Sequence, residues 1–550
     1  MATLSTKATP EASAGPSRRR WLVLGVMSVG TLIVFIDSTV VNTALPAISI
    51  GLGASFSTLQ WVVDSYVLLL SGLLLFGGSL GDRFGRKRWM TAGLLVFGAA
   101  SIGAALAAGV GPLITFRALQ GVGAALVLPA TLSIITNVFP RGERARAIAI
   151  WTAVGGIGLT IGPVLGGYLV DNFGWSAVFW LHVPVVTLAL AGMAVVPESR
   201  DERKLGLDVP GAVLGTAGLM ALVYGIIQGP EAGWTSAEIL ASFGLATALL
   251  AAFALVELRS AAPMLPLRFF RQKDFNGAVL IIGLLIFAML VTFFSLTQYF
   301  QIVQGRGAFE AGLLIVPVSV AIIFAAPVSG QVMKRIGPRN LVLSMAGATV
   351  AAMLMLSGLS VGSSTAAVIV PLLIFGFGAG LGLPALTDTV MAAVPEEDAG
   401  VGSAVNDLSR ELGGALGIAI IGSVVSGLYR SNIDAALTGV VPAEVVDLAR
   451  HSVGVAAITA RSLPAETAAT VLNAASGAFV EAMTAGFRIS AVVLSMVVVI
   501  AFTLIPRRMR VVQARSPEAD GYEAIGPALQ SGPVAPASGP SAASSRADIA

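Results

Sequence analysis

The stretch GGSLGDRFGRKR, residues Gly77–Arg88, is a short polar segment between two long apolar runs. A related segment, SGQVMKRIGPRN, occupies Ser329–Asn340. Four positions correspond at one constant offset: Gly78 with Gly330, Arg83 with Arg335, Gly85 with Gly337, and Lys87 with Arg339. Because the copy follows eight apolar runs later, the pattern predicts two duplicated halves separated by two additional helices.

The composition outside these segments predicts a polytopic helical membrane protein. Of 550 residues, 56% are hydrophobic and only 11% are charged, whereas soluble domains have about 25% charged residues. Runs of about 20 apolar residues recur, and each can cross a hydrocarbon core about 30 Å thick. The chain has no cysteine, which excludes disulfides and thiolate ligands, and its two histidines lie far apart in sequence. We therefore expect no metal site, no cofactor and, without a nucleotide motif, no use of ATP.

Fourteen membrane spans are predicted, in two six-helix halves with two inserted central helices. The spans are about 21–46, 59–80, 89–109, 112–139, 145–170, 176–197, 208–229, 236–257, 274–303, 309–333, 339–360, 366–394, 400–427 and 484–505. The N-terminal half covers 21–197, the inserted pair 208–257, and the C-terminal half 274–505 with a partly helical exterior loop at 428–483. Residues 1–20 and 511–550 are rich in small residues and proline, and we expect disordered tails there.

The distribution of Lys and Arg predicts the orientation, because cytoplasmic loops carry an excess of positive charge. If the N-terminus is cytoplasmic, nearly all loop Lys and Arg lie on the cytoplasmic side. The exceptions are Arg306, Arg430, Arg450 and Arg461. The chain is therefore expected to lie in the cytoplasmic membrane with both termini inside. Its pI near 9.3 reflects this topology rather than nucleic-acid binding.

Four motifs resemble those of the major facilitator superfamily and fall in the expected order. The segment GSLGDRFGRKR, which ends at Arg88, resembles the superfamily's signature between the second and third helices. The segment LITFRALQGVGAA (Leu113–Ala125) resembles the superfamily's arginine motif on the fourth helix. GIGLTIGPVLGG (Gly156–Gly167) resembles the fifth-helix Gly-Pro motif of antiporters. IDSTVVNTALP (Ile36–Pro46) resembles the first-helix motif of the fourteen-span drug:proton antiporters. The chain departs from that pattern at His182, where relatives often have asparagine, and at Lys334, where the first loop has Asp82.

Three charged residues within the predicted spans are candidates for proton coupling. Asp37 and Arg117 fall at about the same depth of the membrane, and Asp64 falls close to that level. A charge at the bilayer centre costs roughly 2.5–3.5 kcal/mol on insertion scales, so it is retained where it has a use. An aspartate there can alternate between protonated and ionised forms as an arginine approaches or withdraws. The alternative is a static Asp37–Arg117 pair that only fixes helix packing, with Asp64 reaching exterior water.

Two glycine-rich motifs are candidates for controlling conformational change. In the Gly-Pro motif, Gly158, Gly162 and Gly166 form a small-residue stripe that lets another helix approach closely, and Pro163 favours a kink. The resemblance adds Gly167 and implies that this packing controls closure of one side. In the loop, the resemblance implies a lock between the halves. The loop residues concerned are Gly78, Asp82, Arg83, Gly85, Arg86 and Lys87. The plainer interpretations are tight packing and a positive charge that sets orientation.

Several other residues are candidates for lining a substrate cavity. Trp61 lies one turn from Asp64 on the same helix face, where an aromatic ring and a carboxylate would together attract a lipophilic cation. The full set is Trp61, Tyr66, Phe294, Tyr299, Asp407 and Arg410. The aromatic residues are also typical of a core or lipid-facing surface, and the residues around Asp407 of a solvated inner mouth. We interpret His182 as a packing residue with satisfied hydrogen bonds.

The resemblance implies a proton-driven exporter of hydrophobic drugs or antibiotics that works by alternating access as a single chain. The carboxylates Asp37 and Asp64 favour cationic substrates. The partners are then a lipophilic small molecule, protons and the lipid bilayer, with no nucleic acid or nucleotide. The alternative is an importer, or an exporter of an endogenous metabolite, in the same superfamily. A membrane enzyme or receptor would need a reactive cluster or a ligand-binding domain, and the sequence contains neither, so we expect no enzymatic activity.

Overall fold

The computed structural model describes residues 17–200, 206–260, 263, 265, 268–394 and 399–507. These residues form helices and no β-strand, and fourteen helical segments among them are long and apolar enough to cross a membrane. The predicted helical polytopic class is confirmed. The tails predicted for 1–16 and 511–550 lie outside the described residues. Residues 17–20, which we assigned to the N-terminal tail, instead form the first turn of α1.

The N-terminal half consists of the first six spans. They are α1 (Ser17–Leu52), α2 (Phe56–Phe84), α3 (Arg86–Ala105), α4 (Val110–Val138), α5 (Arg141–Phe173) and the pair α6 (Ala177–Trp180) and α7 (His182–Gly192). Within this half α2 and α3 pack on α4, and α1 packs on α5. The sixth span continues in a short 3₁₀ turn, Met193–Val195.

The inserted pair and the C-terminal half follow in the predicted order. The inserted helices are α8 (Val209–Ala232) and α9 (Ala237–Arg259). The remaining helices are α10 (Lys273–Gln298), α11 (Ala308–Ile336), α12 (Pro338–Leu356), α13 (Thr365–Ala392), α14 (Ala399–Leu437), α15 (Ala443–Ala449), α16 (Val453–Arg461) and α17 (Ala465–Leu504). The packing of α11 on α13 and of α10 on α14 repeats the packing of α2 on α4 and of α1 on α5, as expected for duplicated halves.

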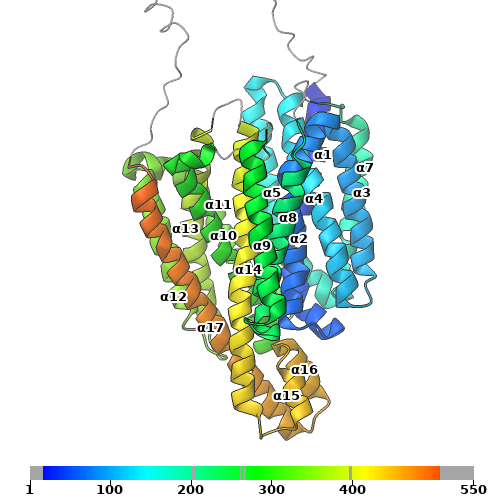
Figure 1. Cartoon of the computed structure of the whole chain (residues 1–550), viewed down its shortest axis with the longest axis vertical. Coiled ribbons are helices and arrows are strands. Elements are labelled where there is room, and N and C mark those ends of the chain that lie inside the picture. The colour runs from blue at the N-terminus through cyan, green and yellow to red at the C-terminus, as the bar shows by residue number, and fades with distance from the viewer. Residues whose placement is uncertain are drawn as a thin grey trace, which may run out of the picture. The chain divides into compact units, whose positions relative to one another are not determined.

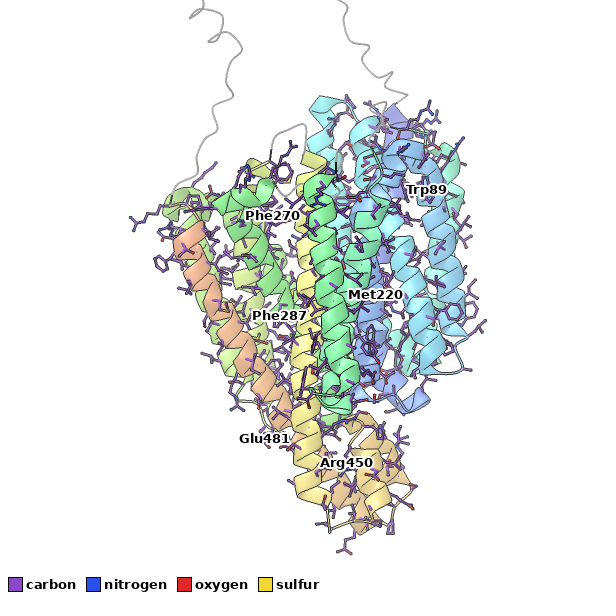
Figure 2. All side chains as sticks on the ribbon, viewed as in Figure 1. Trp89, Met220, Phe270, Phe287, Arg450 and Glu481 are labelled. Carbon is purple, nitrogen blue, oxygen red and sulfur yellow. The ribbon has the colours of Figure 1, made fainter. Side chains whose placement is uncertain are left out.

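The two ends of the bundle differ (Figure 1). Helices α15 and α16 lie beyond one end, which we call the cap end, and α1 begins at the other, which we call the base end. The segment 428–483 is more helical than we predicted, because α14 continues to Leu437 and α17 already begins at Ala465. Polar contacts connect this segment internally: Asn432 donates to Glu481 at 3.1 Å, and Arg450 pairs with Asp447 at 2.7 Å. Figure 2 labels Arg450 and Glu481 in this segment.

The repeated loops form the same kind of turn in both halves. Gly85 joins α2 to α3 with φ of 118°, and Gly337 joins α11 to α12 with φ of 82°. Residues with a side chain rarely adopt this left-handed region, so glycine permits an abrupt reversal of the chain at both positions. The two turns support the duplication inferred from the sequence.

The inserted helix α8 contacts both halves, packing on α2 and on α14, whereas α9 packs on α8 (Figure 1). At the cap end the carboxylate of Glu231 in α8 accepts a hydrogen bond from Ser57 of α2 at 2.7 Å. The same Glu231 oxygen lies 2.9 Å from the Arg430 guanidinium of α14. The inserted pair therefore bridges the two halves along one side.

Candidate functional site

A buried ion pair joins α1 and α4 in the half of the bundle nearest the cap. One Arg117 nitrogen lies 2.8 and 2.7 Å from the two carboxylate oxygens of Asp37. The side chains are 1% and 0% exposed, respectively. Separating a buried pair leaves an uncompensated charge in an apolar medium, which is strongly unfavourable. The shared depth that the sequence predicted for these residues therefore corresponds to direct contact.

Other groups from α2 and α4 hold the Arg117 guanidinium in place. Its Nε donates to the Val62 carbonyl at 3.1 Å, and Nη1 donates to the Gln120 side-chain oxygen at 2.8 Å. The guanidinium carbon lies 4.3 Å from the centre of the Tyr66 ring. A cation over an aromatic face is stabilised by the quadrupole of the ring, more so when both are desolvated. Arg117 thus connects α1, α2 and α4.

Three residues that our sequence analysis did not assign to the site complete this cluster. His182, at the start of α7, places Nε2 3.6 Å from an Asp37 oxygen. Its Nδ1 lies 3.4 Å from the Ser101 hydroxyl, and Gln120 donates to that hydroxyl at 2.8 Å. His182 is 1% exposed, and its Nε2 has no hydrogen-bond partner. Our interpretation of His182 as a packing residue with satisfied hydrogen bonds was therefore wrong.

Asp64 of α2 is buried near this cluster but does not join the ion pair. Its side chain is 0% exposed, and neither carboxylate oxygen has a hydrogen-bond partner. The alternative in which Asp64 reaches exterior water is therefore wrong for this conformation. A buried carboxylate without a partner is costly while it is ionised. That cost favours either a proton or a cationic ligand at this position.

Three of the aromatic residues predicted to line a cavity lie outside the contacts of the Asp37–Arg117 pair. The fourth, Tyr66, contacts Arg117. The Trp61 ring packs on Tyr224 of α8, with 6.1 Å between ring centres. The joint role predicted for Trp61 and Asp64 stays a prediction. Phe294 packs on Phe56 at 5.2 Å, and the Tyr299 hydroxyl donates to the Ser360 carbonyl at 2.7 Å. Interhelical packing directs these rings into the core, which helical spacing alone could not reveal.

Asp407 and Arg410 lie together on α14, toward the base end. Both are half-buried, between the more deeply buried Asn406 and the half-buried Glu411. They are separate from the Asp37–Arg117 cluster, because the side chains within bonding distance of that pair come from α1, α2, α4 and α7. Asp407 and Arg410 thus belong to a further group of charged residues in the described part of the bundle.

Asp82, Arg86 and Lys87 of the loop Gly78–Lys87 have polar contacts near the base end of the N-terminal half. Arg86 pairs with Asp82 at 2.7 Å, and the Lys87 amide donates to Glu198 at 3.0 Å. The Arg83 guanidinium lies 5.3 Å from the centre of the Phe84 ring. The lock between halves that the family resemblance implies is therefore not formed by Asp82 in this conformation.

The Gly-Pro motif of α5 packs against two different helices. Three glycines of the motif face α1. A Cβ added at Gly158 would lie 3.1 Å from Leu32, and one added at Gly166 would lie 2.7 Å from Val40. Gly162 faces Thr39 in the same way. Gly167 instead faces the Ala308 carbonyl of α11, while Gly312 of α11 faces the Pro163 carbonyl. The stripe thus allows close packing within the half and, at its end, close packing across the halves.

Polar contacts between the halves gather toward the cap end. Gln60 of α2 donates to the Ile418 carbonyl of α14 at 2.8 Å. The Asp171 carboxylate, near the end of α5, accepts from the Ala308 and Phe309 amides of α11, both at 2.8 Å. Where the structure describes both partners, no hydrogen bond or ion pair joins the two halves near the base end.

The segment 428–483, which we call the cap segment, makes further contacts with the N-terminal half. The Ser452 hydroxyl lies 3.2 Å from that of Ser49 in α1, and the Phe56 amide donates to the His451 carbonyl at 3.0 Å. A small crevice lies in the same closed layer, lined by Thr39, Asn42, Thr43, Pro163, Phe293, Thr297 and Ile315. The structure is therefore closed at its cap end.

Known proteins resemble this chain in sequence and in fold. Residues 27–418 match the sequence profile of the Major Facilitator Superfamily. The chain is 36% identical over 428 residues to the multidrug resistance protein Stp of Mycobacterium tuberculosis, covering 78% of this chain and 80% of Stp. It is 34% identical over 499 residues to the multidrug efflux pump LfrA of Mycolicibacterium smegmatis, covering 90% and 97%.

A solved structure shares the arrangement of helices. A bacterial homologue of the human lysosomal transporter Spinster superposes with a TM-score of 0.64 at 17% identity, covering 90% of this chain and 100% of that one. The fold, the matched profile and the efflux relatives agree with the motifs on α1, α4 and α5 and with the duplicated turns. The chain belongs to the Major Facilitator Superfamily.

Proposed function

We propose that the protein is a proton-coupled antiporter that exports hydrophobic drugs or antibiotics across the cytoplasmic membrane. The observation that carries the proposal is the buried Asp37–Arg117 pair with His182 beside it, a titratable cluster inside a membrane bundle. The names of Stp and LfrA, which refer to multidrug resistance and multidrug efflux, support the choice of substrate class. Export rather than import is further favoured by the Gly-Pro motif on α5.

Proton coupling follows from the contacts of Asp37. With Arg117 in contact, the carboxylate is stabilised as an anion; when the arginine withdraws, a desolvated aspartate favours its protonated form. The pair joins α1 to α4, and α1 is also packed on α5, which meets α11 of the other half. A movement of the halves is thus transmitted to the helices that hold the pair. Asp64, without a partner, is the second site at which a proton or a cationic substrate would bind.

Alternating access accounts for the uneven distribution of contacts. The halves are joined at the cap end by Gln60, Asp171 and Ser452, and these contacts must break for that end to open. The loop with Asp82 then contacts the C-terminal half at the base end. The excess of Lys and Arg in the base-end loops supports a cytoplasmic location for that end and for both termini. The protein acts as a single chain in this scheme.

Everted membrane vesicles provide the test. With an imposed pH gradient, vesicles that contain the wild-type protein should accumulate a fluorescent lipophilic cation. Asp37→Asn should reduce that accumulation about tenfold or more, which corresponds to the loss of at least one strong interaction. Asp447→Asn, an exposed substitution in the cap segment, is the matched control and should transport normally. Normal gradient-driven transport by Asp37→Asn at wild-type expression would show that Asp37 does not couple transport to protons.

A further inference from the structure

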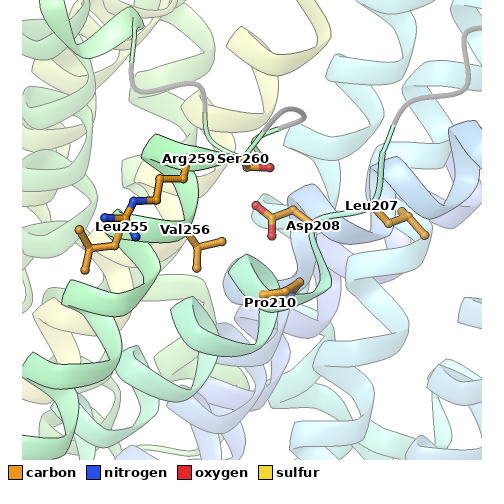
Figure 3. Close-up of a pocket in the computed structure, with 7 residues that line it drawn as sticks. All are labelled: Leu207, Asp208, Pro210, Leu255, Val256, Arg259 and Ser260. Atoms are coloured by element: carbon orange, nitrogen blue, oxygen red, sulfur yellow. The ribbon is translucent and has the colours of Figure 1, made fainter.

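A cavity of about 440 Å³ lies at the base end of the inserted helices (Figure 3). It is lined by seven residues at the start of α8 and the end of α9: Leu207, Asp208, Pro210, Leu255, Val256, Arg259 and Ser260. Its volume falls within the range of about 300–1,000 Å³ that is usual for small-ligand sites. The cavity is remote from the Asp37 cluster, and the proposed transport cycle does not use it.

Asp208 is a buried carboxylate with unused hydrogen-bonding capacity. One oxygen caps α8 by accepting from the Gly211 amide at 2.7 Å. The residue is 8% exposed, and its second oxygen is buried without a hydrogen-bond partner. Figure 3 shows this carboxylate directed from the start of α8 toward the end of α9. A buried carboxylate oxygen without a donor is costly, so a donor that enters the cavity would be bound favourably.

Arg259 brings the opposite charge to the same cavity. It is the last residue of α9 and is exposed. Among the described residues, no ion pair joins Arg259 to Asp208 or to another carboxylate. A negative and a positive side chain that line one cavity without pairing are suited to a zwitterion whose two charges are a few ångströms apart. Arginine in particular binds phosphate through paired N–H donors.

The walls and the position of the cavity indicate a lipid rather than a soluble ligand. Leu255 is 52% exposed and Val209 is 47% exposed, so apolar surface continues from the cavity along the outside of the inserted pair. Both helices are membrane spans, and the cavity lies where these spans end. That is the level of the phospholipid headgroups, with acyl chains alongside the helices.

We propose that this cavity binds the phosphoethanolamine headgroup of a membrane phospholipid. The ammonium group donates to the free oxygen of Asp208, and the phosphate contacts Arg259. A phosphatidylcholine headgroup carries the same charges but no N–H donor, so it leaves the Asp208 oxygen without a partner. A phosphatidylglycerol headgroup has no cation, so it places only its phosphate in the cavity.

Native mass spectrometry of the full chain in mixed micelles tests this proposal, with phosphatidylethanolamine, phosphatidylcholine and phosphatidylglycerol supplied at equal amounts. We expect wild-type protein to retain the ethanolamine lipid about tenfold over the choline lipid, as for one charge-assisted hydrogen bond. Asp208→Asn should abolish that preference while preserving the fold, because asparagine caps helices as well as aspartate does. Arg259→Gln should reduce retention of both lipids.

Matched controls come from the same end of the bundle. Asp274→Asn, in the first turn of α10, and Arg271→Gln, just before α10, remove the same charges outside the cavity and should retain the wild-type preference. Soluble glycerophosphoethanolamine at millimolar concentration should not displace the lipid. Equal retention of the three lipids, an unchanged preference in Asp208→Asn, or displacement by the soluble compound would each overturn the proposal. Because the readout is lipid retention, the result does not depend on whether the protein exports drugs.

Discussion

At the scale of single residues, Asp64 and Asp37 are two buried carboxylates with different surroundings. Asp37 contacts Arg117 and lies beside His182, whereas both oxygens of Asp64 lack a partner. The first carboxylate thus has a cationic partner, and the second is suited to gaining a proton or a cation. The difference allows the two residues to be tested separately.

We predict that Asp64→Asn leaves the fold intact and changes substrate selection. Replacing an unpartnered carboxylate by a neutral group of the same shape removes an unfavourable burial, so the thermal unfolding midpoint should stay the same or rise by about 2 °C. The ratio of cation to anion export in matched compounds should fall about tenfold, as for loss of one buried charge pairing. Thermal unfolding in detergent and vesicle transport measure the two effects. A lower midpoint, or an unchanged ratio, contradicts this role.

The residues of the site could be predicted from sequence only in part. Asp37 and Arg117 are charges in apolar runs, and counting residues along their helices was enough to place them at one depth. Ser101, Gln120 and His182 belong to residue types that are also common in packed interiors, and their contacts depend on how α3, α4 and α7 are rotated. Helix rotation is set by tertiary packing, which the sequence pattern of a uniformly apolar helix does not reveal. A histidine in such a helix, as at His182, was the one available signal.

At the scale of helices, the close approach of α5 to α11 is the contact that most directly joins the halves. Gly167 faces the Ala308 carbonyl, and Asp171 accepts from two amides at the start of α11. Amides at a helix N-terminus carry partial positive charge, so the Asp171 carboxylate stabilises this contact electrostatically. Sequence indicated that a helix packs closely on this glycine stripe, but it did not indicate that α1 packs on most of it and α11 on its end.

We predict that Gly167→Val prevents closure at the cap end. The added side chain would overlap the α11 backbone, which cannot move without separating α5 from α11. A single cysteine introduced at Ser49 should then react with a maleimide reagent faster than in the otherwise wild-type chain, and transport should be lost. Gly156→Val is the control on the same helix, since a Cβ there meets nothing within 4 Å. Equal reactivity in the two valine variants would argue against a role for this contact in closure.

At the scale of the whole molecule, the closed cap end and the duplicated turns describe one state of a two-state transporter. The number of spans, their order and the duplication were predicted correctly, because a membrane helix is recognisable from its own composition. The continuation of α14 and α17 into the cap was not, since hydropathy reports where a helix leaves the membrane and not where it ends.

A disulfide across the cap should trap this state. In Ser49→Cys/Ser452→Cys the two sulfur atoms replace hydroxyls 3.2 Å apart, and the native chain has no cysteine to compete. We expect oxidation to abolish transport and reduction to restore it, with each single-cysteine variant unaffected. Transport that continues at the wild-type rate after complete crosslinking would show that the cap need not separate from α1.

The same cysteine pair reports on the base-end loop. We predict that Asp82→Asn favours the cap-closed state, because the family resemblance gives Asp82 contacts across the halves only when the base end is closed. Crosslinking of the pair at sub-saturating oxidant should then become about two- to fivefold faster, which is the range expected for loss of one exposed charge interaction. An unchanged rate would mean that Asp82 is an orientation signal alone.

The position of α8 has a consequence for the route by which a compound dissolved in the bilayer enters the protein. Two seams separate the halves, one between α2 and α14 and the other between α5 and α11. Helix α8 packs on both α2 and α14, and Glu231 contacts a residue of each. Among the described residues, neither inserted helix packs extensively on α5 or α11. Without the inserted pair, the duplicated halves would leave two equivalent lateral openings toward the bilayer. With the inserted pair in place, we expect compounds dissolved in the bilayer to enter the protein only between α5 and α11.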